Sequence, residues 1–172
     1  MEVLEVVVKK LDPRNIYFRP LKFMAMATIA SESFSGMRPQ EKALEWIRAS
    51  FLAWPRMQYF VAESSGIVVG YILWVEKGGF REESVWELEQ IAVSEKCRGQ
   101  KVGTKMILES LQEIKKYLYQ RGSWLKLVEV TTGTHNTAQR LYEDTLGAKR
   151  ECAIRDLFGG DEAIMVARFS KP

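Results

Sequence analysis

The stretch that most constrains the fold runs from Trp86 to Glu109 and reads WELEQIAVSEKCRGQKVGTKMILE. Its first part is rich in apolar residues and contains no proline, which predicts a largely buried strand that ends near Ser94. A polar, basic segment with glycine follows. Beyond it, apolar residues recur at spacings of three and four, which predicts a helix that begins near Gly103 and Thr104. The chain therefore contains a strand, a glycine loop and a helix in direct succession.

The start of this helix is suited to bind an anion. The first amide N–H groups of a helix lack intrahelical partners, and the helix dipole favours negative charge there by about 0.3–1 kcal/mol. Glycine also lets the backbone approach an anion closely. Four cations lie in or beside the loop, namely Lys96, Arg98, Lys101 and Lys105. The segment predicts a site for a group that carries several phosphates, with a solvated basic turn as the alternative.

A chain of 172 residues with 47% hydrophobic and 27% charged residues is typical of one soluble domain of ordinary size. The formal net charge of +3 is too small to indicate a nucleic-acid partner. Two cysteines and one histidine predict neither a metal site nor a disulfide framework, so a cytoplasmic setting is the default. The apolar run Ile67–Val75 is far shorter than the roughly 20 residues that span a membrane, and the N-terminus does not resemble a signal peptide.

The rest of the chain predicts alternating strands and helices with turn residues between them. A strand that follows the helix after the glycine loop completes a βαβ unit. We expect one α/β domain at residues 16–172, with a mixed central sheet and helices on both faces, and an N-terminal extension at residues 1–15. The predicted strands are Ile16–Arg19, Tyr59–Glu63, Ile67–Glu76, Val85–Val93, Trp124–Thr132, Lys149–Phe158 and Ala163–Phe169. The predicted helices lie between Pro20 and Gly36, from Pro39 to Pro55, from Gly103 through Leu118, and around Ala138–Leu146.

This order of elements and two motifs resemble the GNAT superfamily of acetyl-coenzyme A (acetyl-CoA) dependent N-acetyltransferases. The family's cofactor signature is Arg or Gln, two residues, Gly, one residue, then Gly or Ala. Arg98, Lys101 and Gly103 occupy those three slots, and Lys101 departs from the pattern because the family has glycine there. The resemblance spans about Ile16 to Phe169. It implies acetyl-CoA as cosubstrate, and as acceptor an amine on a small molecule, protein or peptide.

The second motif, HNTAQRLYEDTLGAK, is similar to the family's Asn, two residues, Ala, two residues, Leu or Phe, Tyr, with a Leu-Gly-Phe ending. His135 falls in the usual asparagine slot and Asn136 lies one residue later, so either of them is a candidate for the pantetheine contact. The resemblance also places a backbone N–H near Ile91 or Val93 at the thioester carbonyl, as in an oxyanion hole. The cofactor-binding residues that it implies are Ile91, Ala92, Val93, Arg98, Gly99, Gln100, Lys101, Val102, Gly103, Thr104 and Asn136.

Acetyl transfer to an amine requires a neutral nitrogen, whereas a lysine-type amine with a pKa near 10.4 is mostly protonated at neutral pH. A carboxylate that accepts the proton, directly or through water, typically contributes about 10²- to 10⁴-fold in rate. Glu87, Glu89 and Glu129 are the candidates by position on predicted strands. By resemblance, Glu87 matches the base of histone-type members, and Glu129 falls near the base of ribosomal-protein N-terminal acetyltransferases. The choice stays open, with a solvated strand face as the alternative.

The thiolate that leaves in such a reaction benefits from a proton donor, and by resemblance Tyr142 fills this role. Its alternative is a buried aromatic residue on the stripe of its helix. Cys97 lies beside Arg98 in the sequence, and a neighbouring cation favours a reactive thiolate. A role as an acyl-carrying nucleophile is nevertheless disfavoured, because no activating base is evident.

Two other functions compete with acetyl transfer. A non-catalytic module that binds or senses coenzyme A fits the replaced glycine, and a nucleotide-triphosphate site is disfavoured because the loop lacks the Gly-x-x-x-x-Gly-Lys-Ser/Thr order. The acceptor and the oligomeric state, including a homodimer, stay open.

Overall fold

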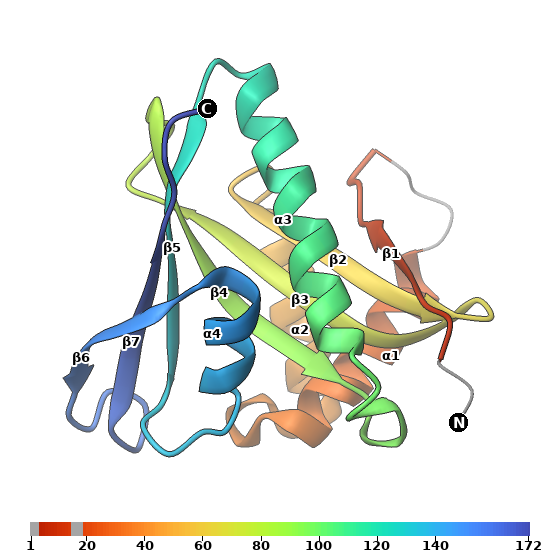
Figure 1. Cartoon of the computed structure of the whole chain (residues 1–172). Coiled ribbons are helices and arrows are strands. Elements are labelled where there is room, and N and C mark those ends of the chain that lie inside the picture. Colours follow the sequence, from red (N-terminus) through yellow and green to blue (C-terminus); the bar gives the residue numbers. More distant parts are fainter. Residues whose placement is uncertain (1–3, 15–18) are drawn as a thin grey trace. The chain divides into compact units, whose positions relative to one another are not determined.

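In the computed structural model, which describes residues 4–14 and 19–172, strands and helices alternate along the chain. The elements are β1 (Val7–Lys10), α1 (Arg19–Ser33), η1 (Ser35–Met37), α2 (Gln40–Phe51), β2 (Met57–Ser64), β3 (Ile67–Lys77), β4 (Glu83–Val93), η2 (Glu95–Cys97), α3 (Val102–Gln120), β5 (Trp124–Gly133), α4 (Gln139–Leu146), β6 (Lys149–Ile154) and β7 (Glu162–Arg168). Within the described residues the strands form a seven-stranded sheet in the order β1-β2-β3-β4-β5-β7-β6 (Figure 1).

The sheet is mixed, as predicted. Strands β4 and β5 are parallel, with α3 between them in the chain, whereas the pairs β1–β2, β5–β7 and β6–β7 are antiparallel. A parallel pair requires a long crossover, and α3 supplies it, so the βαβ unit expected from the sequence is present. The predicted fold class, α/β with a mixed central sheet, is confirmed.

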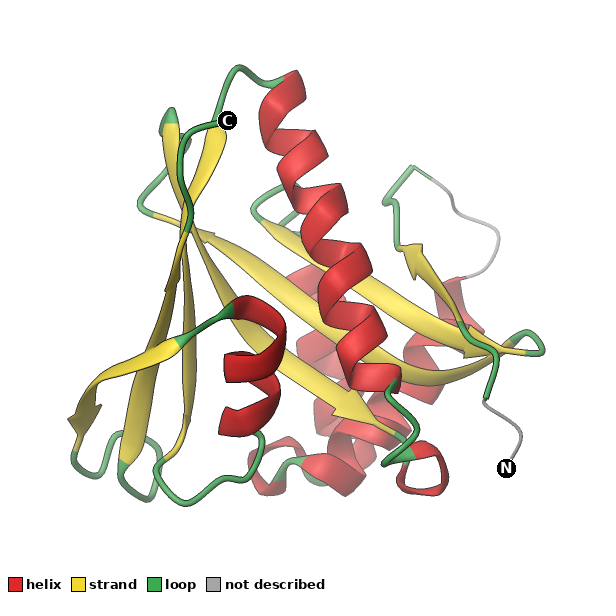
Figure 2. Ribbon diagram, viewed as in Figure 1, coloured by secondary structure: helices red, strands yellow, loops and turns green. Residues whose placement is uncertain are grey.

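The chain divides into two compact units, one made of Met1–Leu73 with Gln90–Met106 and the other of Trp74–Glu89 with Ile107–Pro172. In the first unit α1 and α2 pack together, with the Phe23 and Phe51 rings 5.0 Å apart between their centroids. Helix α2 also contacts β2, and the beginning of α3 lies on the other face of these strands (Figure 2). The predicted placement of helices on both faces therefore holds within this unit.

Gly70 lets the beginning of α3 lie close to β3 in the first unit. A Cβ atom at this position would lie 3.0 Å from the Ala92 carbonyl oxygen and 3.0 Å from Cε of Met106. The backbone oxygen cannot move aside as a flexible side chain can. Glycine at position 70 is thus required by the close packing of β3, β4 and α3.

In the second unit α3 packs against the ends of β3 and β4. The Trp74 indole N–H donates to the Ser110 hydroxyl at 2.8 Å, and the Trp86 ring lies 6.1 Å from that of Tyr117. The side chain of Glu76 is 1% exposed and is paired with Arg121 at 2.5 Å. A buried carboxylate is costly unless it is paired and hydrogen-bonded, so Arg121 is what permits Glu76 in this core.

Several predicted boundaries need correction. The strand predicted at Lys149–Phe158 ends at Ile154, because the chain turns at Asp156, which has a φ of 51°. The brief strand predicted at Ile16–Arg19 falls mostly on residues 16–18, which lie outside the described residues, and Arg19 begins α1. The chain forms strand β1 within the predicted extension. The boundary at residue 16 stays a prediction.

We expect the Gly70→Ala variant to be less stable than the wild type by about 1–3 kcal/mol, because the added methyl group overpacks a site closed by backbone. Urea unfolding followed by circular dichroism measures the difference. The matched control is Gly36→Ala, because a Cβ at Gly36 meets no atom within 4 Å. Equal stability of the Gly70 and Gly36 variants would contradict the close packing inferred at β3.

Candidate functional site

Strand β4 presents two different faces. Ser84, Trp86 and Leu88 are buried, and Trp86 contacts Tyr117 of α3. Because successive side chains of a strand point to opposite faces, Glu87 and Glu89 share the face that is turned away from α3. The expectation that these two glutamates lie on one side of the strand is confirmed, and both are partly exposed.

Glu87 lies beside Glu129, since the two residues are register partners on the parallel strands β4 and β5. Lys77, at the end of β3, lies between their carboxylates: its Nζ is 2.9 Å from Oε2 of Glu87 and 3.8 Å from Oε1 of Glu129. The structure thus brings together two of the three glutamates named as candidate bases and adds a lysine that the sequence did not single out. No local pattern around Lys77 could have identified it, since its role depends on the pairing of three strands.

The ammonium group of Lys77 is strongly held. The hydrogen bond to Glu87 is the main cause that raises the pKa of Lys77, with further attraction from Glu87, Glu129 and Glu89, while partial burial acts in the opposite direction. Lys77 therefore stays protonated at neutral pH. This face of the sheet holds the ammonium group of Lys77 between two carboxylates.

The pairing of β4 with β5 runs from Glu83↔Trp124 to Glu87↔Glu129, whereas β5 continues to pair with β7 as far as Gly133↔Glu162. Within the second unit, β5 thus pairs with β7 beyond Glu129, from Val130 to Gly133.

The loop before α3 has the geometry of an anion site. Gly99 has a φ of 75° and Lys101 a φ of 60°, after which α3 begins at Val102. The amide of Lys105 donates to the Lys101 carbonyl at 3.0 Å as an i→i−4 helical bond. The amides of Val102, Gly103 and Thr104 come before this bond, at the positions where a helix start presents its N–H groups to a ligand. A phosphate-bearing group fits this arrangement.

Lys101 adopts a left-handed conformation at the slot where the family signature has glycine. A residue with a Cβ atom adopts positive φ less readily than glycine does. The structure nevertheless gives this residue the backbone shape of a glycine, at a typical cost of about 1–2 kcal/mol for a side chain with a Cβ atom. The replacement changes the energy of the loop and not its path.

Arg98 holds the loop in place. Its Nε donates to the Val93 carbonyl at 3.1 Å, and its Nη2 donates to the hydroxyl of Ser33, the last residue of α1, at 3.4 Å. The Gln100 side chain donates to the Lys96 carbonyl at 3.2 Å. Arg98 and Gln100, which were predicted as cofactor contacts, therefore have partners within the protein. The groups placed to bind an anion are the backbone amides at the start of α3.

Tyr142 and Asn136 lie in the second unit. The Asn136 side-chain oxygen accepts from the Ala138 amide at 2.9 Å, just before α4 begins. This local bond is a helix-start role for Asn136, and its pantetheine contact stays a prediction. Tyr142 is 6% exposed, and burial raises the pKa of its phenol to about 12. The phenol thus keeps its proton over the physiological range, as a proton donor requires.

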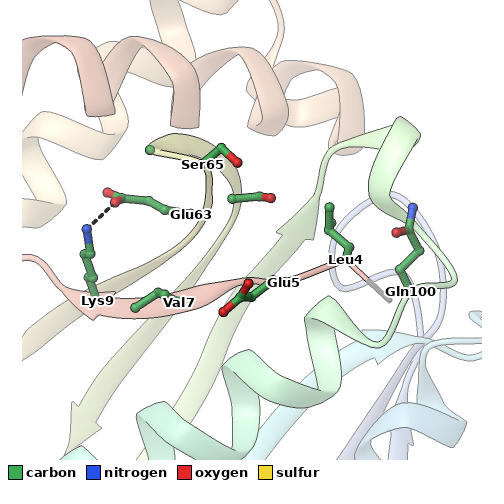
Figure 3. Close-up of a pocket in the computed structure, with 9 residues that line it drawn as sticks. Leu4, Glu5, Val7, Lys9, Glu63, Ser65 and Gln100 are labelled. Atoms are coloured by element: carbon green, nitrogen blue, oxygen red, sulfur yellow. Dashed lines mark hydrogen bonds and ion pairs between the residues drawn. The ribbon is translucent and has the colours of Figure 1, made fainter. Parts of the chain in front are cut away.

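A separate cavity of about 590 Å³ lies in the first unit between β1, the β2–β3 turn and Gln100 (Figure 3). Its charged lining residues are Glu5, Lys9 and Glu63, and Figure 3 shows the side chains of Lys9 and Glu63 pointing toward each other. Burial favours the neutral form of Glu63, but hydrogen bonds from Lys22 and Lys9 outweigh it and lower the pKa of this carboxyl. The Glu63 side chain thus joins β1 and α1 to β2, and of the predicted site residues the cavity includes Gln100.

In the part of the chain that the structure describes, no group of three or more His, Cys, Asp or Glu residues is placed to hold a metal ion. Among the same residues, no helix is both long and apolar enough to cross a membrane.

The mixed sheet, the βαβ unit and the loop before α3 define an α/β fold of the acetyltransferase class. Residues 23–148 match the sequence profile of the Acetyltransferase (GNAT) family, and the chain belongs to this family. The resemblance read from the two motifs is thereby confirmed. No match to the sequence was found among curated proteins.

Several solved structures have the same fold. A chain of the NatC complex bound to Gag peptide and CoA is 19% identical, with a TM-score of 0.75 over 96% of this chain and 99% of that chain. An aminoglycoside 6'-N-acetyltransferase complexed with coenzyme A is 15% identical, with a TM-score of 0.73 and the same coverage of 96% and 99%. Ard1 from Thermoplasma volcanium is 16% identical, with a TM-score of 0.67, again over 96% and 99%. At these identities the likeness is one of fold.

The left-handed backbone at Lys101 leads to a stability prediction. We expect Lys101→Gly to be more stable than Lys101→Ala by about 0.5–1 kcal/mol, because glycine relieves the positive φ but gains entropy in the unfolded chain. Both variants lose the same charge, so each controls for the other. Urea unfolding provides the measurement, and an alanine variant as stable as the glycine variant would show that the cost of the left-handed conformation is no larger than the entropy effect of glycine.

Proposed function

We propose that the protein transfers an acetyl group from acetyl-CoA to the nitrogen of an amine, by direct attack within a ternary complex. The match of residues 23–148 to the acetyltransferase family carries this proposal. Two of the similar structures contain coenzyme A, which supports acetyl-CoA as the cosubstrate. In this role acetyl-CoA supplies an activated acetyl thioester.

The loop before α3 binds the pyrophosphate of the cosubstrate in this proposal. The amides of Val102, Gly103 and Thr104 donate to phosphate oxygens, and the cationic side chains of the loop add attraction. Arg98 fixes the loop through Val93 and Ser33. The backbone near Ile91 and Val93 donates to the thioester carbonyl, which lowers the energy of the developing oxyanion.

Glu87 and Glu129 are the candidates to take the proton from the acceptor ammonium. Both carboxylates lie beside one ammonium group, that of Lys77, so their face of the sheet already accommodates a cationic amine. Glu87 makes the shorter contact, at 2.9 Å, and its side chain is less exposed, at 16% against 27% for Glu129. These observations favour Glu87 as the base and Glu129 as a second carboxylate that attracts the acceptor.

The acceptor is a primary amine on a small molecule or a peptide. The similar structures support both kinds of acceptor, since one is a complex with Gag peptide and another is an aminoglycoside acetyltransferase. We propose a cytoplasmic location, since the two free cysteines fit a reducing compartment. Incubation of a cell extract with labelled acetyl-CoA, followed by mass spectrometry of the acetylated products, identifies the acceptor class.

A second candidate function is binding or sensing of coenzyme A without transfer. The lysine in the glycine slot of the loop favours it, because this residue departs from the family's cofactor signature. Binding of acetyl-CoA with no acetylated product from polyamines, amino acids, peptides and aminoglycosides would establish this function in place of catalysis.

We expect the double variant Arg98→Glu, Gly103→Asp to lose measurable acetyl-CoA binding, since it places two negative charges at the helix start. Isothermal titration calorimetry with acetyl-CoA measures the loss. Gly36→Asp is the matched control, because the same kind of substitution enters open space. Retained binding in the double variant would remove the loop from the cosubstrate site.

We expect the Glu87→Gln variant to lose about 10²- to 10⁴-fold in kcat, the usual contribution of a general base, and the Glu129→Gln variant to lose about tenfold or less. Steady-state assays with the identified acceptor make the comparison. The reverse order would assign the base to Glu129.

We expect the Tyr142→Phe variant to lower kcat by about 10²-fold, with an acetyl-CoA affinity close to that of the wild type. The phenylalanine keeps the buried ring but removes the proton donor. Because the pKa of Tyr142 is raised to about 12, the phenol of the wild type causes no loss of kcat on the alkaline side up to pH 10. An unchanged kcat in the variant would exclude the donor role.

A further inference from the structure

A second cavity, of about 500 Å³, lies in the second unit beside the two candidate bases, and a volume of this size suits a small molecule. Its lining includes Val85 of β4 and Leu127 of β5, which are register partners. The next pair on the same face is Glu87 and Glu129, two residues further along each strand, or about 6.6 Å. The cavity and the two carboxylates therefore lie next to each other on one face of the sheet.

The lining of this cavity combines apolar and cationic side chains. Val85 and Leu127 are partly exposed and offer an apolar surface along the strands. The charged lining residues are three cations and one carboxylate, namely Lys77, Arg81, Lys126 and Glu83. Such a lining favours a ligand that has an apolar body and a negatively charged group.

Arg81 is the cation of this lining that is best placed to bind that group. The other two cations are each paired with a glutamate, at 2.9 Å for Lys77 and at 2.6 Å for Lys126. Arg81 donates from Nε to the Gly78 carbonyl at 2.8 Å, and within the described part of the chain its guanidinium is in no ion pair. Its Nη groups can therefore donate to a carboxylate, in the planar geometry that arginine provides.

The turn between β3 and β4 holds the Arg81 side chain close to its backbone. Gly78 has a φ of 73°, and a Cβ atom at this position would lie 3.1 Å from Nε of Arg81. The guanidinium thus packs against the turn where a side chain at position 78 would crowd it. An arginine that is already anchored at Nε loses less conformational entropy when a ligand binds to the rest of the group.

This sheet face consequently carries opposite charges at its two ends. The carboxylates of Glu87 and Glu129 lie at one end, Arg81 lies at the other, and Val85 comes between them along β4. We propose that the acceptor is an amine whose apolar chain lies in this cavity and ends in a carboxylate bound by Arg81, which makes Arg81 a specificity-determining residue.

This inference rests on the proposed function, in which Glu87 accepts the acceptor's proton. It narrows the acceptor from primary amines in general to amines with a distant carboxylate, and it disfavours acceptors with several positive charges. The reaction stays the same: the nitrogen forms a bond to the acetyl carbonyl carbon, the thioester bond breaks, and coenzyme A leaves as its thiol. The carboxylate of the acceptor takes no part in the chemistry.

The test uses acceptors of equal chain length that differ only at the end distant from the amine. ε-Aminocaproate ends in a carboxylate, hexylamine in a methyl group and hexamethylenediamine in a second ammonium. The shorter series is γ-aminobutyrate, butylamine and putrescine. With acetyl-CoA as donor, we expect the wild-type kcat/KM for the carboxylate of at least one series to exceed that for the methyl analogue by about tenfold, with the diamine lowest.

The variants Arg81→Met and Arg81→Glu show whether Arg81 causes this preference. We expect the ratio of kcat/KM between carboxylate and methyl acceptors to fall about tenfold in Arg81→Met, and the order to reverse in favour of the diamine in Arg81→Glu. Arg155→Glu is the matched control, since Arg155 is an exposed arginine of the second unit that does not line this cavity. It keeps the wild-type ratio.

A purely structural role for Arg81 predicts a different result. It would lower kcat/KM for all three acceptors of a series by one factor and leave their ratio in place, and this outcome would overturn the proposal. Equal wild-type rates with all three acceptors, or an equal change of the ratio in Arg155→Glu, would overturn it as well. Thermal unfolding of each variant shows whether the fold is retained.

An acidic residue near a peptide N-terminus presents the same chemistry as a free amino acid. Two short peptides that differ only in their second residue, glutamate or lysine, distinguish these sources. A preference for the glutamate peptide that is lost in Arg81→Met, and that exceeds the preference among the small amines, assigns the carboxylate to a peptide. A preference confined to the small amines assigns it to a free amino acid.

A binding measurement separates this inference from the proposed function. Calorimetry with ε-aminocaproate and γ-aminobutyrate, on protein saturated with coenzyme A, is expected to show an affinity for at least one of them that falls about tenfold in Arg81→Met. This result in a protein that forms no acetylated product upholds the cavity and refutes acetyl transfer. Acetylation of amines without any preference for a carboxylate upholds acetyl transfer and refutes the role of Arg81.

Discussion

The parallel ladder between β4 and β5 is the interaction on which the candidate site depends. It aligns Glu83 with Trp124 and ends with Glu87 beside Glu129. The register determines that two carboxylates from distant parts of the sequence share one face. A shift by one residue would turn these side chains to opposite faces, because the period of a strand is two.

Charge compensation follows from that register. In the second unit a glutamate is paired with a cation both in the core and at the surface. Buried Glu76 is paired with Arg121, which locks the packing of α3 against β3, whereas partly exposed Glu87 is paired with Lys77. A buried pair stabilises structure because it cannot separate cheaply. A partly exposed pair with a flexible lysine separates at lower cost.

The loop before α3 shows that backbone shape can be kept when its usual residue is lost. Lys101 takes the left-handed conformation that glycine would take, and Arg98 secures the loop through Val93 and Ser33. The strain at one residue is offset by the side-chain contacts of another. A departure from a family signature therefore does not by itself remove the geometry that the signature encodes.

The sequence by itself determined the strand, loop and helix at Trp86–Glu109, most of the other elements and the family, because periodicity, turn residues and motif spacing are local properties. It missed the turn at Asp156, since positive φ in a non-glycine residue has no clear local signal. Only the tertiary structure decided that Glu87, Glu129 and Lys77 meet, since strand register brings together residues that are far apart in the chain. The physical reason is that contacts across a sheet depend on pairing, and pairing is set by the packing of the whole core.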